Sequence, residues 1–179
     1  MRPSKKTSIL DAAARVVEKD GIAAVTYDSV AAESGITKGG LVYHFPSRES
    51  LITALHHHLA DAWEAGMAAA AGRTPDQATD TERLRGYVRA AVTSATRAEI
   101  LFLLEGATTT EHAAPWNTVL QRWVPHAPGP EADAGDVDRF IARLAADGLW
   151  MYESLSSDTL DPEVRQKIAD AISERIIDR

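Results

Sequence analysis

The sequence has no cysteine among its 179 residues, and aromatic residues make up only 6% of the chain. Without cysteine there is neither a disulfide framework nor a thiol nucleophile, and a reducing cytosol is the simplest location. The richest apolar run, Ile100–Leu104, has five residues, whereas a membrane-spanning helix needs about 20. The first residues, Met1–Lys6, lack the apolar segment of a signal peptide. We therefore expect a soluble, cytoplasmic protein that does not bind membranes.

Motifs for catalysis are also missing from the sequence. It has no nucleophile elbow and no pair of carboxylates in a recognisable setting, and no strand precedes Gly39-Gly40 to make it a nucleotide-binding loop. Neighbouring residues of a helix point about 100° apart, so His56, His57 and His58 cannot hold one metal ion together. Apart from Asp61, five residues after His56, no nearby Asp, Glu or His completes a set at helical spacing, although one of these histidines could line a pocket or sense pH. We predict no enzyme activity, no cofactor and no metal site.

Negative charge is in excess, with a net charge of −7, but it is unevenly distributed. Residues 1–50 carry seven Lys/Arg and six Asp/Glu, whereas the remainder carries twelve against twenty. An acidic C-terminal part would be held away from phosphates, and local cations of the N-terminal part would make any contact with nucleic acid. Arg2, Lys5 and Lys6 form a basic arm that either contacts DNA or simply keeps the terminus soluble.

The stretch from Thr26 to Leu51 predicts two short helices joined by a tight turn. Thr26 or Asp28 can cap the first helix, because their side-chain oxygens accept bonds from free backbone N–H groups. Gly35 stands where the chain leaves this helix, and Thr37 caps the second helix two residues later. A turn of about three or four residues is the length found in a helix-turn-helix.

The second of these helices has two different faces. Leu41 and Phe45 are four residues apart and are expected to point inward, whereas Lys38, Val42 and Tyr43 are expected to point outward. Seven residues make a helix roughly 10 Å long, which fits a major groove about 12 Å wide.

Two glycines, Gly39 and Gly40, fall in the first turn of this helix. Each destabilises a helix by about 1 kcal/mol relative to alanine. A helix whose N-terminus must approach DNA closely has a use for them, because glycine leaves the backbone open.

Many positions of this stretch fit one known pattern together. It resembles the DNA-binding motif of the tetracycline-repressor (TetR) family of bacterial regulators, and the resemblance covers about the first 50 residues. The matching residues are Thr26, Val30-Ala31, Ser34-Gly35-Ile36-Thr37, Lys38-Gly39, Leu41, Tyr43-His44-Phe45, Arg48 and Leu51.

The resemblance implies an all-α fold of about nine helices. A three-helix DNA-binding domain with a helix-turn-helix would occupy residues 1–50, and a larger helical domain for ligand binding and dimerisation would occupy residues 51–179. The protein would be a homodimeric transcriptional regulator, and we expect a repressor that a small-molecule ligand releases from a near-palindromic operator. The two recognition helices would enter successive major grooves.

The expected DNA contacts come from nine residues of the motif. Lys38 would read guanine O6 and N7, and Val42 would meet a thymine methyl group. Four side chains would position the protein on phosphates: Thr26, Tyr43, His44 and Arg48. The complete set is Thr26, Thr37, Lys38, Gly39, Gly40, Val42, Tyr43, His44 and Arg48.

Bulky side chains of the larger domain are expected to line a ligand pocket, because the family's inducer cavity lies there. The pocket would be largely apolar and would take a small apolar or amphipathic ligand. Each of these residues could instead belong to the core. The candidates are Trp63, Met67, Tyr87, Phe102, Leu103, Trp116, Trp123 and Trp150, with Thr109, His112 and Asn117 as polar anchors.

The middle of the chain predicts two further helices. Ile100–Leu104 is apolar on all sides, so its helix should pass through the centre of the larger domain. Pro115 is expected to be the first residue of the next helix, which Pro125 terminates.

The last two predicted helices, Asp136–Leu155 and Pro162–Ile177, are expected to form the dimer interface. Asp136 would cap the first and Asp161 the second. Both carry more apolar surface than one partner needs, which favours a symmetric four-helix interface. Gly148 would allow close approach, and packing within one chain is the alternative.

Two other functions stay open at this point. The chain could be a helical protein-interaction module whose DNA-binding face is idle, and such a module would lack salt-dependent DNA binding. An enzyme on this scaffold would need a titratable cluster in the pocket, which the sequence does not reveal.

Overall fold

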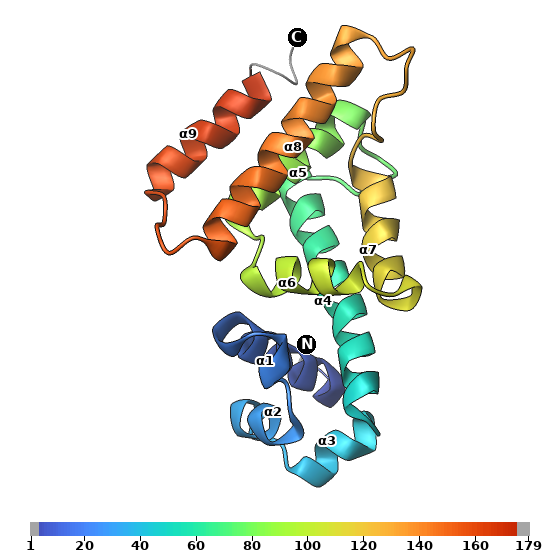
Figure 1. The fold of residues 1–179 in the computed structure, drawn as a ribbon, viewed down its shortest axis with the longest axis vertical. Coiled ribbons are helices and arrows are strands. Elements are labelled where there is room, and N and C mark those ends of the chain that lie inside the picture. Colours follow the sequence, from blue (N-terminus) through green and yellow to red (C-terminus); the bar gives the residue numbers. More distant parts are fainter. Residues whose placement is uncertain (1–3, 175–179) are drawn as a thin grey trace. The chain divides into compact units, whose positions relative to one another are not determined.

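The computed structural model describes residues 4–174, and these residues form nine α-helices and one short 3-10 helix (Figure 1). The chain folds as two compact units. The first contains the residues up to Asp61 together with Thr96–Trp116, and the second contains Ala62–Ala95 and the chain from Asn117 onward. The all-α prediction is confirmed, whereas the functional division after residue 50 stays a prediction.

The first unit consists of the N-terminal helices, the beginning of α4, α6 and the beginning of α7. Within it, α1 packs against α2, the 3-10 helix and α6, and α2 packs against α3. The bounds are α1 Lys5–Asp20, η1 Ile22–Ala24, α2 Tyr27–Ser34, α3 Lys38–His44, α4 Arg48–Ala71, α6 Arg97–Gly106 and α7 Thr110–Trp123.

Local sequence accounts for the helix-turn-helix. Thr26 caps α2 in a reciprocal pair with Ser29, in which each side chain accepts a bond from the other residue's backbone N–H. Gly35 has a left-handed backbone with φ of 69°, a conformation that favours glycine. The side chain of Thr37 then caps α3 by accepting a bond from the N–H of Gly40. These predicted features are confirmed.

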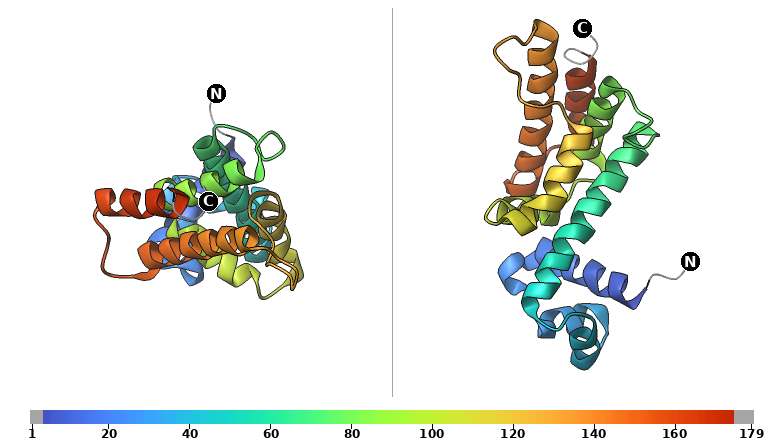
Figure 2. Two further views of the ribbon diagram at one scale, coloured as in Figure 1. Left: turned by 90° about the horizontal axis from the view of Figure 1, so that it is seen from above. Right: turned by 90° about the vertical axis from the view of Figure 1, so that its right-hand side faces the viewer.

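The second unit contains the end of α4, the end of α7 and three whole helices. These are α5 (Asp80–Thr93), α8 (Ala134–Leu155) and α9 (Pro162–Ile172). The three contact one another, with α5 against both α8 and α9, and the two views of Figure 2 show α8 and α9 along their length. None of the helices within residues 4–174 is both long and apolar enough to cross a membrane.

The prediction that Pro115 begins a helix is wrong, because Pro115 lies inside α7. The helix begins earlier, since the side chain of Thr109 accepts a bond from the N–H of His112 and so acts as a cap. Proline has no N–H, so α7 lacks the hydrogen bond that residue 115 would otherwise donate to the carbonyl of Glu111.

Two other predicted details are also wrong. Asp133 caps α8 in place of Asp136, and Asp136 instead accepts the reciprocal bond from the N–H of Asp133. The helix through Ile100–Leu104 is not buried on all sides, because Leu104 is 53% exposed. Of the predicted Pro162–Ile177 helix, residues 175–177 lie outside the described part of the chain.

Glu99 is a buried carboxylic acid in the first unit, and its ionisation links stability to pH. Its Oε2 accepts a bond from the N–H of Thr96 at 2.8 Å and so caps α6. Burial raises the pKa of Glu99 to about 7, from a usual value of 4.5, in spite of the bonds from Thr96 that lower it. The folded protein therefore holds this proton more tightly than the unfolded chain, so the stabilisation is complete below about pH 4.5 and is lost as the pH rises to about 7.

We predict that Glu99→Gln removes this pH dependence, because the amide oxygen keeps the cap and carries no charge. Between pH 4.5 and pH 8, the free energy of unfolding of the wild-type protein should fall by roughly 3 kcal/mol relative to that of the variant. Urea unfolding at several pH values measures this difference. Glu82→Gln is the matched control. Glu82 caps α5 in the same way but has a lowered pKa, owing first to the bond from the Thr79 backbone. Equal pH profiles for the wild type and Glu99→Gln would contradict the prediction.

Candidate nucleic-acid interface

Helix α3 separates its buried and exposed residues as the sequence predicted. Leu41 and Phe45 are almost fully buried, whereas Tyr43 is 82% exposed and Val42 is 43% exposed. Lys38 is exposed as well. The outward face thus presents a cation, an aliphatic group and a phenol to solvent.

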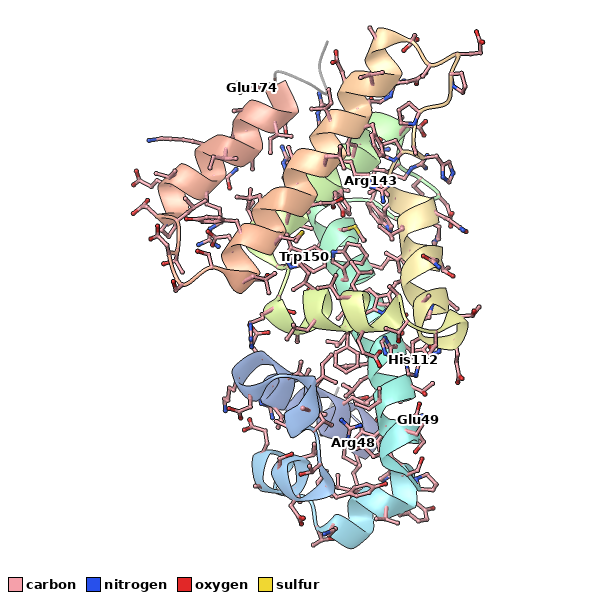
Figure 3. All side chains as sticks on the ribbon, in the orientation of Figure 1. Arg48, Glu49, His112, Arg143, Trp150 and Glu174 are labelled. Carbon is pink, nitrogen blue, oxygen red and sulfur yellow. The ribbon has the colours of Figure 1, made fainter. Side chains whose placement is uncertain are left out.

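Polar contacts to backbone carbonyls fix the chain on either side of α3. The hydroxyl of Tyr27 donates to the carbonyl of Phe45 at 2.6 Å. The guanidinium of Arg48, labelled in Figure 3, donates from Nε to Val25 at 2.8 Å and from its terminal nitrogen to Ile22 at 3.2 Å. In this structure Arg48 holds the segment before α2, and its predicted phosphate contact stays a prediction. No local pattern in the sequence indicates this role of Tyr27, because its partner lies 18 residues away.

The two predicted cap threonines, Thr26 and Thr37, are exposed but have their side chains engaged at helix ends. If Thr26 and Thr37 also contact DNA, their hydroxyl groups make these contacts in addition to the bonds that cap the helices. His44 is half-buried, and its ring lies edge-on to Tyr43 with centroids 5.1 Å apart. Of the basic arm, Arg2 lies outside the described residues, whereas Lys6 places its ammonium 5.7 Å from the ring centroid of Phe45.

The two glycines of α3 have different surroundings. A Cβ atom built on Gly39 would meet nothing within 4 Å, so this backbone is open. A Cβ on Gly40 would lie 3.0 Å from the side chain of Ile36. Packing therefore accounts for Gly40, whereas the expected approach of Gly39 to DNA stays a prediction.

An ion pair joins α3 to α2 at the predicted reading position. Nζ of Lys38 lies 3.0 and 3.1 Å from the two carboxylate oxygens of Asp28. Both side chains are more than half exposed, and such a pair stabilises a protein by about 0–1 kcal/mol. From the sequence alone, Asp28 is expected only as a helix cap. Its carboxylate can instead hold the Lys38 ammonium, or accept a bond from cytosine N4.

The predicted ligand-pocket residues are divided between the two units. In the second unit Trp63 contacts the rings of Tyr87 and Trp150, with centroids 5.8 and 5.3 Å away. In the first unit Phe102 and Trp116 both contact the ring of His56. All five aromatic residues are buried in side-chain packing.

The polar contacts of these residues also lie within the two units. The hydroxyl of Tyr87 donates to the carboxylate of Asp147, whose pKa is raised by burial although the Tyr87 bond lowers it. Trp123 donates to Glu64 at 3.0 Å and lines a surface pocket of about 600 Å³ beside Pro125–Gly129.

The remaining candidates are in varied positions. Met67 is buried, Leu103 is half-buried and Asn117 is exposed. Thr109 caps α7, whereas His112 is buried and bonded to Glu105. A ligand pocket shared by all eight candidates stays a prediction.

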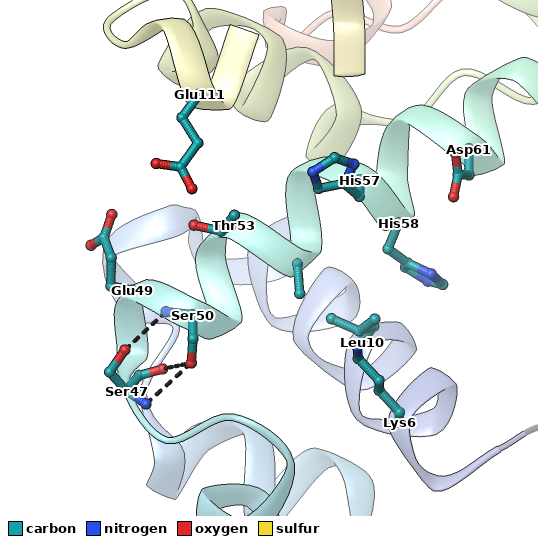
Figure 4. Close-up of a pocket in the computed structure, with 11 residues that line it drawn as sticks. Lys6, Leu10, Ser47, Glu49, Ser50, Thr53, His57, His58, Asp61 and Glu111 are labelled. Atoms are coloured by element: carbon teal, nitrogen blue, oxygen red, sulfur yellow. Dashed lines mark hydrogen bonds between the residues drawn. The ribbon is translucent and has the colours of Figure 1, made fainter. Parts of the chain in front are cut away.

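The three adjacent histidines point in different directions, as helical geometry requires. His56 is buried, and burial lowers its pKa. His58 bonds to Asp11 of α1 at 2.8 Å, and His57 is exposed. His57 and His58 line a groove of about 670 Å³ along α4 (Figure 4). Three acidic side chains, Glu49, Asp61 and Glu111, line the same groove.

Two segments of the sequence match models of known protein families. Residues 9–55 match the family model described as bacterial regulatory proteins of the tetR family, and residues 81–176 match the model described as the tetracyclin repressor-like C-terminal domain. No curated protein matches the chain.

Solved structures share the fold at low sequence identity. A putative TetR-family transcriptional regulator from Rhodococcus sp. is 17% identical with a TM-score of 0.69, over 97% of this chain and 100% of the other. AibR, solved with isovaleryl coenzyme A and operator DNA, is 24% identical with a TM-score of 0.65, over 97% and 98%. EbrR, solved with malachite green, is 22% identical with a TM-score of 0.58, over 95% and 98%.

The two family models together cover the helix-turn-helix and most of the second half of the chain, and the C-terminal match alone spans more than half of the 179 residues. The chain therefore belongs to the TetR family of bacterial transcriptional regulators.

Proposed function

We propose that this protein is a homodimeric repressor that binds a near-palindromic operator through α3 and leaves it when a small molecule binds. The observation that carries the proposal is the outward face of α3. Lys38, Val42 and Tyr43 stand exposed there, while Leu41 and Phe45 anchor the helix in the core. Large apolar and aromatic side chains exposed on a short, firmly anchored helix fit base edges in a major groove.

The ligand part of the proposal is supported by two structural neighbours, AibR and EbrR, which were solved with small molecules bound. In this chain the buried aromatic group of Trp63, Tyr87 and Trp150 supplies apolar surface. Beside it, Asp147 and Tyr87 supply polar groups. An apolar wall with few polar groups is typical of a small-molecule site. A ligand that favoured a conformer with a different half-site spacing would lower DNA affinity by linkage.

The dimer part of the proposal is supported by an apolar stripe on α8. The stripe recurs every three or four residues, the spacing of one helix face. Its five large side chains are between 41% and 53% exposed, and a Cβ atom built on Gly148 within it would meet nothing within 4 Å. A second copy of the chain would bury this face by symmetry. The stripe consists of Val137, Ile141, Leu144, Gly148, Met151 and Leu155.

The proposed function is tested by selecting sequences from random double-stranded DNA with the purified protein. Enrichment of a palindrome that binds with a steep salt dependence supports it, because phosphate contacts release counterions. The rival interaction module would bind no DNA in a salt-dependent manner. A folded protein that enriches no sequence at low salt would overturn the proposal.

We predict that Lys38→Ala weakens binding to the selected operator by about 1–3 kcal/mol and relaxes specificity at one base pair of each half-site. The pair with Asp28 is worth less than this contact, so Lys38 can exchange Asp28 for a guanine. Fluorescence anisotropy with operators altered at single positions measures both effects.

Lys19→Ala is the matched control for Lys38→Ala. Lys19 is equally exposed and is likewise paired with a carboxylate, that of Glu33, but it lies on α1. Equal weakening of all DNA sequences by Lys38→Ala would show that Lys38 does not read a base.

We predict that Leu144→Glu converts the dimer into a monomer, because it places a charge in the centre of the apolar stripe. Sedimentation velocity measures the oligomeric state. Leu104→Glu is the matched control, since both leucines are 53% exposed but Leu104 lies on α6. A Leu144→Glu variant that sediments as wild-type dimer would place the interface elsewhere.

A further inference from the structure

Three side chains of the types that ligate metal ions meet inside the first compact unit. His56 of α4 is fully buried, and His112 of α7 is 5% exposed. Nε2 of His56 lies 2.7 Å from Oε2 of Glu105 on α6, and Nδ1 of His112 lies 3.2 Å from the same oxygen. One donor atom from each residue lies within 4.8 Å of the other two. The imidazole rings of His56 and His112 are also stacked, with centroids 4.2 Å apart.

Hydrogen bonds around the cluster fix which ring nitrogens are available. The indole N–H of Trp116 donates to Nδ1 of His56 at 2.9 Å, so the proton of the neutral His56 ring is on Nε2 and points at Glu105. On His112, Nε2 lies 3.3 Å from the hydroxyl oxygen of Thr53 and 3.7 Å from a carboxylate oxygen of Glu49.

We propose that His56, Glu105 and His112 bind a divalent transition-metal ion of the zinc class. Two imidazole nitrogens and one carboxylate oxygen form a donor set that such ions use. Bonds of roughly 2.0–2.1 Å in a tetrahedral site separate neighbouring donors by about 3.3 Å. The measured separations from Glu105, 2.7 and 3.2 Å, reach this value with small shifts. The fourth position is left for water or an external ligand.

The surroundings of His112 support the assignment. A histidine that binds a metal usually donates its other N–H to an oxygen, which fixes the ring. With the metal on Nδ1, the Nε2–H of His112 points at Thr53 and Glu49. Thr53 and Glu49 also line the groove of Figure 4, whose carboxylates include Glu111. The carboxylates of Glu49 and Glu111 therefore attract a cation to the region beside the cluster.

Metal binding has a defined consequence for Trp116. An ion on Nε2 of His56 replaces the proton there, and the neutral ring then carries its proton on Nδ1. This N–H would face the N–H of Trp116, so the hydrogen bond between them is lost and the indole must move. Trp116 lies on α7, and the ion thereby changes the packing of this helix against α4 within the first unit.

Calorimetric titration of the untagged, chelator-treated full-length protein with ZnCl₂ tests the proposal. One ion per chain should bind, and Glu105→Gln and His112→Ala should each weaken binding at least tenfold. Co²⁺ should give the intense visible absorption of a tetrahedral site. Zn²⁺ should change the tryptophan fluorescence of the wild type, and Trp116→Phe should lose most of this change while still binding the ion.

His57→Ala and His58→Ala are the matched controls, because these histidines neighbour His56 on α4 but lie outside the cluster. Both variants should bind Zn²⁺ as the wild type does. Far-UV circular dichroism and thermal unfolding confirm that each variant is folded, and Glu105→Gln keeps the shape of the cluster if His112→Ala does not fold. The absence of stoichiometric binding to the wild type, or binding that depends on His57 or His58 and not on Glu105, would overturn the proposal.

Discussion

Burial of Leu41 and Phe45 sets the rotation of α3 about its own axis, and the composition of the outward face depends on that rotation. Because the two residues are one helical turn apart, their side chains anchor a single side of a short helix. Tyr43, two residues after Leu41, then lies on the other side, where it is 82% exposed. The bond from Tyr27 to the carbonyl of Phe45 closes the C-terminal end of α3. A seven-residue helix is marginal by itself, so these tertiary contacts, more than helix propensity, hold it in position.

The parts of the fold that the sequence predicted are those decided by neighbouring residues. Gly35 and Thr37 lie within three residues of the helix ends that they determine, and their roles could be read directly. Asp136 and Pro115 were placed wrongly because a second residue nearby, Asp133 or Thr109, can make the same cap. Side-chain partners such as Glu105, 49 residues from His56, could not be predicted, since nothing local in the sequence specifies which helix a buried polar residue will face.

Helix α8 buries one of its sides in the chain and exposes apolar side chains on another. Ala142, Ala146 and Trp150 are buried within the chain, so the intramolecular core uses one side of the helix and leaves the stripe that contains Leu144 and Met151 uncovered. The sequence indicates a surplus of apolar residues here, but only the structure separates the side that the chain buries from the side that it leaves exposed.

The open space around Gly39 has a consequence for how freely this regulator can change its operator. Because a methyl group at this position would touch nothing in the free protein, alanine should make α3 more stable by up to about 1 kcal/mol. The free fold therefore gives no reason for glycine, which agrees with the proposed close approach of a phosphate or base edge to this backbone in the DNA complex. In the proposed complex, a substitution at Gly39 would alter recognition without repacking the core, and affinity and fold stability would change in opposite directions.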